Sequence, residues 1–90
     1  MTLEDWDQFN ARLYVCASRL NGLPRHTTRD CRRMSDTVSN LLRAADQERV
    51  NCRRRNQITT RYTDLMQQAQ EALKNLEGHV IIATLMRKDQ

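Results

Sequence analysis

Glycine and proline, the residues that most often interrupt helices, are scarce in this sequence. Its 90 residues include two glycines and one proline, and neither occurs between Thr27 and Gly78. This scarcity leaves little room for a loop-rich fold and favours long helices. The length allows one domain, so we predict a single all-α domain over residues 1–90.

Aromatic residues are also few. Hydrophobic residues make up 39% of the chain against 29% charged residues, and the full aromatic set is Trp6, Phe9, Tyr14 and Tyr62. A compact chain of this length buries only about 60–65% of its unfolded surface. A solitary globule would therefore have a thin core, and the composition favours helices that associate in an oligomer.

No apolar stretch typical of a signal peptide opens the sequence, so we expect no secretory leader. No apolar run approaches the roughly 18 residues of a membrane span. Its three cysteines, Cys16, Cys31 and Cys52, form no CxxC pair, and we expect them to pack as small hydrophobic side chains. His26 and His79 have no His or Cys at ligand spacing, so we expect no metal and no cofactor. These features predict a soluble, reduced, intracellular protein of the cytoplasm or nucleus.

Enzyme motifs are missing as well. The chain has no glycine-rich phosphate loop, no Ser/His/Asp grouping and no paired carboxylates with a cleft to hold a substrate. We therefore expect no catalytic residues and a protein that is not an enzyme.

What the sequence does contain is apolar periodicity in two segments. In the first, apolar residues recur three and four positions apart, at Trp6, Phe9, Leu13, Cys16 and Leu20. This pattern predicts an amphipathic helix over about residues 3–21. Gly22, expected in a left-handed cap, and Pro24 end it in a turn over residues 22–27.

The second segment carries an unbroken heptad pattern, which predicts one long helix over about residues 28–88. Its a positions are Cys31, Val38, Ala45, Cys52, Thr59, Met66, Leu73 and Val80, and its d positions are Met34, Leu41, Glu48, Arg55, Tyr62, Ala69, Leu76 and Ala83. Further apolar residues at positions e and g widen the stripe, so each part of this helix should have at least two neighbours. The first helix, folded back as a hairpin, covers only part of it.

Two arrangements bury the heptad stripe through the same antiparallel pairs of facing residues, and the two residue numbers in each pair sum to 107. The pairs form between two chains in one arrangement and within a single chain in the other. We expect an antiparallel coiled-coil or helical-bundle homodimer, with Glu48 facing Thr59 in a polar waist that fixes the register. The alternative is a monomeric three-helix bundle with a bend within residues 51–56. The expected interface residues are Met34, Val38, Leu41, Ala45, Tyr62, Met66, Leu73 and Leu76.

Arginine is concentrated in the middle of the chain, where ten of these residues lie between positions 23 and 62. On the heptad frame, one outward-facing flank holds Arg25, Arg32, Arg33, Arg53, Arg54 and Arg61. Such a flank could bind an acidic protein or a phosphate backbone, or it could simply be a solvated helix face. No aromatic residue is interleaved for base stacking, so an acidic protein is favoured over nucleic acid.

The C-terminal run from residue 80 to 86 is apolar on all sides. We interpret it as a surface for a protein partner, formed by Val80, Ile81, Ile82, Leu85 and Met86, although it could also pack under the first helix. The function we expect is a non-enzymatic interaction module, either a self-associating helical scaffold or an assembly subunit of a larger complex. The alternatives are a nucleic-acid-binding helical dimer and a small chaperone or adaptor that masks a partner helix.

Overall fold

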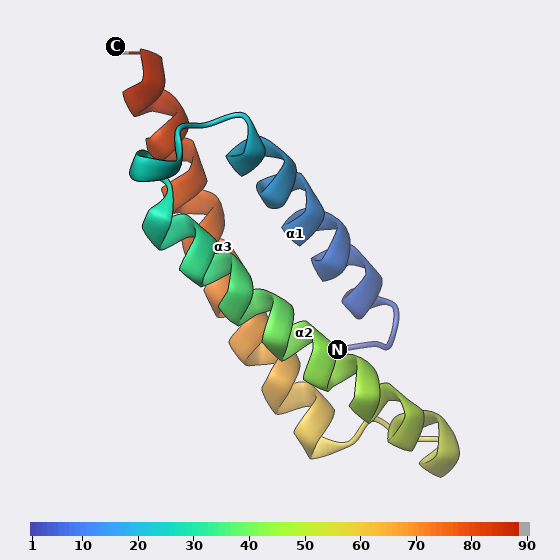
Figure 1. Cartoon of the computed structure of the whole chain (residues 1–90). Helices are drawn as coiled ribbons and strands as arrows, with labels where there is room; N and C mark the ends of the chain where they lie inside the picture. Colours follow the sequence, from blue (N-terminus) through green and yellow to red (C-terminus); the bar gives the residue numbers. More distant parts are fainter. Residues whose placement is uncertain (89–90) are drawn as a thin grey trace.

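The computed structural model describes residues 1–88, with side chains through residue 86, and this part of the chain is all-helical. Helix α1 spans Asp5–Asn21, the short 3-10 helix η1 spans Arg25–Thr27, α2 spans Arg29–Arg55 and α3 spans Thr60–Lys88. The predicted all-α hairpin is therefore confirmed. In Figure 1, α1 and α3 both run antiparallel to α2, and the rod they form measures 53 × 17 × 17 Å.

The prediction of one helix over residues 28–88 is wrong. Helix α2 ends at Arg55, and Asn56 adopts a left-handed conformation with φ 53° and ψ 40°. The Asn56 N–H donates to the Arg53 carbonyl (3.2 Å) and the Gln57 N–H to the Cys52 carbonyl (3.1 Å). This pair of bonds is the Schellman motif, with asparagine in the position usually held by glycine. The chain therefore turns back on itself at Asn56, at the edge of the bend allowed in the three-helix alternative.

The register between α2 and α3 is the predicted one. The Thr59 hydroxyl donates to a Glu48 carboxylate oxygen at 2.9 Å. This contact joins two residues whose numbers sum to 107, as expected, but it forms within one chain. Arg55, which the heptad pattern places at a d position, is exposed.

The heptad seam forms the core of this single chain. Of the eight predicted interface residues, Met34 and Leu41 are partly buried, and the fully buried ones are Val38, Ala45, Tyr62, Met66, Leu73 and Leu76. One chain thus covers most of its own seam by placing α1 and α3 beside α2. The homodimer expected from these residues remains a prediction.

Helix α1 completes the bundle with its own stripe, in which Phe9, Leu13, Cys16 and Leu20 are buried. It ends as predicted at Asn21, but Gly22 has φ −90° and ψ 1° and is not left-handed. Ahead of α1, the Thr2 carbonyl accepts a hydrogen bond from the Tyr62 hydroxyl at 2.8 Å. Burial raises the pKa of Tyr62 to about 12, so this hydroxyl keeps its proton and anchors the N-terminal segment to α3.

Candidate protein-interaction surface

The last turns of α3 carry apolar side chains on two sides. One side enters the core, where Val80 is 1% exposed and Ala83 is buried. The other side faces solvent: Ile81 is 53% exposed, and Ile82, Leu85 and Met86 are each 56% exposed. Assigning Val80 to a partner surface was therefore wrong, because its heptad a position points into the bundle. The other four residues lie where a partner can reach them.

These exposed residues follow a helical spacing. Together with Gly78 they occupy positions i, i+3, i+4, i+7 and i+8, so they line one stripe along α3. We call residues Gly78, Ile81, Ile82, Leu85 and Met86 the outer stripe. A Cβ atom added at Gly78 would meet no other atom within 4 Å, so the stripe has an open, flat position one turn before Ile81 and Ile82. Stripes with this spacing are the surfaces on which helices dock.

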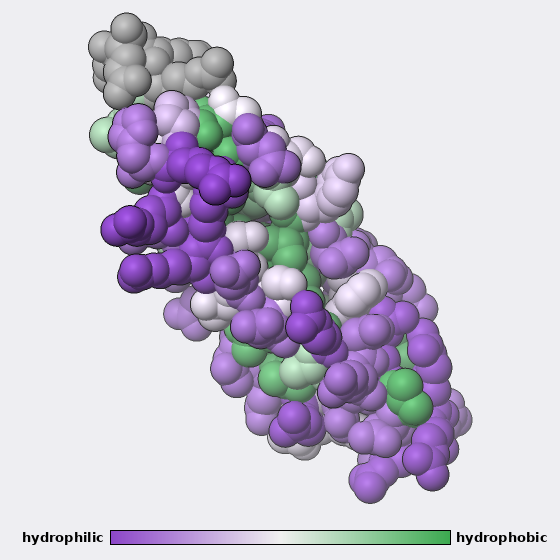
Figure 2. Space-filling view, in the orientation of Figure 1, coloured by the Kyte–Doolittle hydropathy of each residue, from purple (hydrophilic) through white to green (hydrophobic). Residues whose placement is uncertain are grey.

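Beside the outer stripe, α1 and α3 form a groove. It has a volume of about 310 Å³ and is lined by Arg19, Leu23, Ile81, Thr84 and Leu85. Figure 2 shows apolar side chains exposed between polar ones on the face of the molecule drawn there. The groove lies at the end of the bundle where α1 turns towards η1 (Figure 1).

An ion pair holds α1 beside α3 next to this groove. The Arg12 guanidinium donates to both carboxylate oxygens of Glu77, at 2.6 and 3.1 Å. These hydrogen bonds raise the pKa of Arg12, against the opposing effect of its partial desolvation. Both side chains are about one-third exposed, so the pair adds little to stability but fixes the position of α1 along α3.

A second clamp holds the start of α1 against α2. The Trp6 indole N–H donates to the Leu42 carbonyl at 2.7 Å, and the Arg49 guanidinium lies 4.6 Å from the centre of the indole ring. Asp46 lies 3.4 Å and Asp7 3.9 Å from Arg49. The two carboxylates and the cation–π contact offset part of the cost of burying Arg49, whose Nε and Nη1 atoms are buried without a hydrogen bond. Sequence analysis missed this clamp because it requires knowing the offset between two helices.

A polar cluster closes the α2–α3 turn. Glu48 accepts hydrogen bonds from Thr59 and from Asn51 (3.1 Å), and its carboxylate lies 3.7 Å from Arg61. The hydrogen bond from Thr59 is the largest cause that lowers the pKa of Glu48, followed by the one from Asn51. The carboxylate is held ionised by a hydroxyl and an amide, which suits a structural anchor for the turn.

Replacing Glu48 by Gln should reduce the loss of folding stability that the protein shows as the pH falls. The folded state lowers the pKa of Glu48 below the unfolded value of about 4.3. The ionised carboxylate therefore stabilises the fold above the unfolded value, and this stabilisation is lost as the pH falls through the folded-state pKa. Urea titrations from neutral to acidic pH should show a smaller loss for Glu48→Gln than for the parent. Glu71→Gln, at an exposed residue without a hydrogen bond in the described chain, should behave like the parent; equal slopes for all three proteins would contradict the assignment.

The predicted arginine flank is divided in the structure. Arg25, Arg32 and Arg33 lie at the η1 end of α2, whereas Arg53, Arg54 and Arg61 lie at the α2–α3 turn. Along α2, Arg32 and Arg53 are separated by about 30 Å of helix. Asp36 and Asp46 lie between the two groups. The flank therefore consists of two arginine groups at opposite ends of α2, and its role as one binding surface stays a prediction.

The cysteines and histidines form no reactive or metal-binding group within residues 1–88. All three cysteines are buried and unpaired, and burial raises the pKa of Cys16 and Cys31, which keeps both as thiols. No group of three His, Cys, Asp or Glu residues is placed to hold a metal in this part of the chain. Within the same residues, none of the helices combines the length and apolarity that crossing a bilayer requires.

Comparison of the chain with models of known families, with curated proteins and with solved structures finds no match.

Proposed function

We propose that this chain is a non-enzymatic, self-associating helical module that serves as an assembly subunit in the cytoplasm or nucleus. The observation that carries the proposal is the outer stripe, a helix-docking pattern left exposed on a helix whose opposite side is already buried in the core. The three buried, unpaired thiols are compatible with a reducing compartment.

The occupant we assign to the outer stripe is a second copy of the same stripe. If two copies of α3 pack antiparallel about an axis between Ile81 and Ile82, Leu85 of each copy lies over Gly78 of the other. A bulky side chain then meets the flat, open position that the absent Cβ leaves. A twofold contact of this kind is self-complementary, as closed homodimers require.

The proposed dimer is weak and concentration-dependent. Four half-exposed side chains form a patch of a few hundred Å², less than the roughly 800 Å² per partner of a standard stable interface. The chain mass is 10.6 kDa, so sedimentation equilibrium should show a rise towards twice that value with increasing concentration. A parent protein that stays at 10.6 kDa up to about 1 mM would contradict self-association, since a Kd above that concentration means a binding free energy weaker than about −4 kcal/mol.

Two substitutions should weaken the dimer while preserving the fold. Leu85→Asp places a carboxylate in the proposed contact and should give a monomer at all concentrations. Gly78→Ala should stabilise the monomer by about 1 kcal/mol, because alanine is the better helix former and the added Cβ has open space. The same Cβ occupies the space over which Leu85 of the other copy packs in the proposed dimer. Association should therefore weaken while the free energy of unfolding of the monomer increases.

Val50→Asp is the matched control, because Val50 is an apolar residue of α2 exposed to 53% and lies far from the outer stripe along the chain. It should dimerise like the parent. If Val50→Asp and Leu85→Asp weaken association equally, or if Gly78→Ala strengthens it, the proposed contact is wrong.

A further inference from the structure

The turn between α1 and α2 is tightly hydrogen-bonded. The hydroxyls of Thr27 and Thr28 both donate to the Pro24 carbonyl, at 2.9 and 3.1 Å. Thr28 is fully buried, and its backbone N–H donates to the Arg25 carbonyl at 3.2 Å. These bonds, with the restricted φ of Pro24, give η1 and the first turn of α2 a defined geometry.

This geometry presets one guanidinium. Arg32 donates from Nε to the Thr28 hydroxyl at 3.2 Å and from Nη2 to the Leu20 carbonyl at 3.3 Å. The two contacts use part of its hydrogen-bond donors and fix the plane of the group before any ligand arrives. A preset donor loses less conformational entropy on binding than a mobile one.

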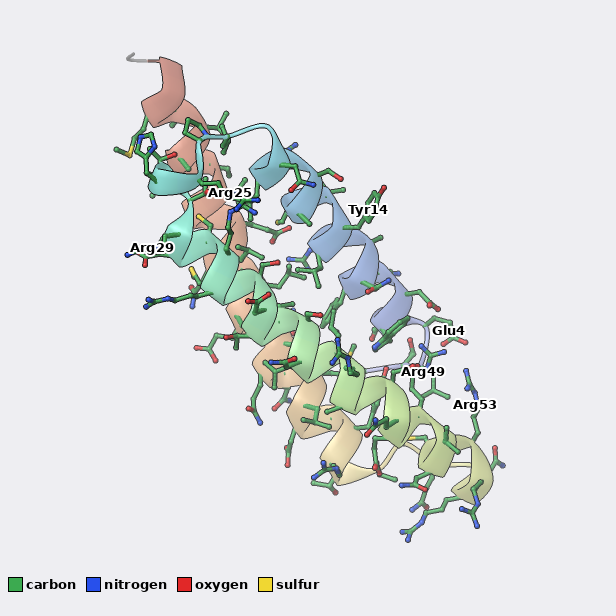
Figure 3. The ribbon with its side chains drawn as sticks, viewed as in Figure 1. Glu4, Tyr14, Arg25, Arg29, Arg49 and Arg53 are labelled. Atoms are coloured by element: carbon green, nitrogen blue, oxygen red, sulfur yellow. The ribbon has the colours of Figure 1, made fainter. Side chains whose placement is uncertain are left out.

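Three more cationic or N–H-bearing side chains share a hollow with Arg32. Arg25, His26, Arg29 and Arg32 line a space of about 520 Å³. Figure 3 shows Arg25 and Arg29 at the end of the molecule where α2 begins, and Figure 2 shows strongly hydrophilic side chains gathered over that end. We call these four residues the basic hollow.

The basic hollow has no counterion in the described chain. Arg12, Arg49 and Arg61 each lie within 4 Å of a carboxylate, namely Glu77, Asp46 and Glu48. Among residues 1–88, by contrast, no ion pair is formed by Arg25, Arg29 or Arg32. Several positive groups are thus held around one space without an internal anion, which leaves their charge available to a ligand.

We propose that the basic hollow binds a single phosphate dianion, the chemistry that a phosphoserine side chain and free inorganic phosphate share. Several guanidinium groups around one space match a ligand whose three terminal oxygens share two negative charges better than they match a carboxylate, which one arginine can satisfy. A nucleic-acid backbone is disfavoured, because it would need a continuous basic track. The next arginine cluster lies about 30 Å further along α2, and the helix between carries Asp36, Asp46 and Glu48 against Arg43 and Arg49. This site is independent of self-association through the outer stripe.

Nuclear magnetic resonance titration of the full chain with inorganic phosphate tests the site, with sodium chloride at matched ionic strength as the blank. Saturable shifts should be confined to residues 24–33. In Arg25→Gln/Arg29→Gln the apparent Kd should rise at least about tenfold, since each lost arginine removes charge-assisted hydrogen bonds. Arg53→Gln/Arg54→Gln removes the same charge at the other end of α2 and should leave the Kd unchanged. All four substituted residues are exposed, so the circular dichroism spectra should match the parent spectrum.

Further ligands identify the source of the phosphate and the limits of the proposal. O-phosphoserine that binds at least as tightly as inorganic phosphate assigns the site to a phosphorylated side chain, and tighter binding of inorganic phosphate assigns it to the free anion. The proposal is overturned if phosphate shifts no more than chloride does, or if both double variants weaken binding alike. It is also overturned if single-stranded DNA binds more tightly than phosphate and depends equally on both clusters.

Discussion

Leu73→Asp is expected to unfold the chain in buffer, whereas Leu85→Asp, the same substitution on the same helix, should leave it folded. Leu73 is 0% exposed and lies in the core between α2 and α3, while Leu85 is 56% exposed on the outer stripe. A carboxylate without a partner in an apolar core costs several kcal/mol, in addition to the about 2–5 kcal/mol lost with the leucine side chain. Small domains have only about 5–15 kcal/mol of stability in total.

Circular dichroism and urea unfolding of the two variants decide the matter. Leu73→Asp should lose most of its helical signal, and Leu85→Asp should keep the parent spectrum and a cooperative transition. Leu73→Ala provides a milder variant in case the charged protein cannot be purified, and it should lower the urea midpoint clearly. If Leu73→Asp and Leu85→Asp are equally stable, the seam between α2 and α3 is not the core.

Replacing residues 56–59 by four alanines is expected to join α2 and α3 into one helix. The turn depends on the left-handed backbone conformation at position 56, which costs asparagine less than alanine. It also depends on the hydrogen bond from the Thr59 hydroxyl to Glu48. With these signals removed, the heptad seam of one chain can be buried only by another chain. The product is a domain-swapped dimer with the same layers, a mass of twice 10.6 kDa and a higher helical content.

This swapped dimer is distinguishable from association through the outer stripe. Addition of Leu85→Asp should leave the mass of the alanine variant doubled, because the swapped seam does not include that residue. Asn56→Gly is the matched control, since glycine adopts the left-handed conformation without cost and should preserve the hairpin. An alanine variant that sediments like the parent would show that packing, rather than the turn residues, fixes the bend.

The heptad pattern predicted the core well because burial follows a local spacing. From Cys31 to Val80 every a position is buried except Thr59, which is partly buried, and the Glu48–Thr59 register was also correct. The long helix was wrong because its stop signal is a single asparagine. Asparagine is acceptable inside a helix and also adopts the left-handed conformation more readily than most residues, so the sequence alone does not show which of the two Asn56 takes.

The features missed from sequence are those that depend on how helices are placed. The contacts between Arg12 and Glu77 and between Trp6 and Arg49 join residues far apart in the chain, so no local sequence pattern predicts them. The apolar run over residues 80–86 could not show which side enters the core, and Val80 was therefore assigned to the surface. The basic hollow also includes two residues that the predicted flank left out: His26, which lies in η1, and Arg29, the first residue of α2.

The most direct test of the hairpin is a distance between α2 and α3 within one molecule. Spin labels introduced through unnatural amino acids at the exposed residues Asn40 and Gln67, diluted with unlabelled protein, report only that distance. These positions sum to 107 and face each other across helices packed about 10 Å apart, so the labels should lie well within about 25 Å of each other. A distance of about 40 Å, the length of one straight helix between these residues, would contradict the folded-back bundle.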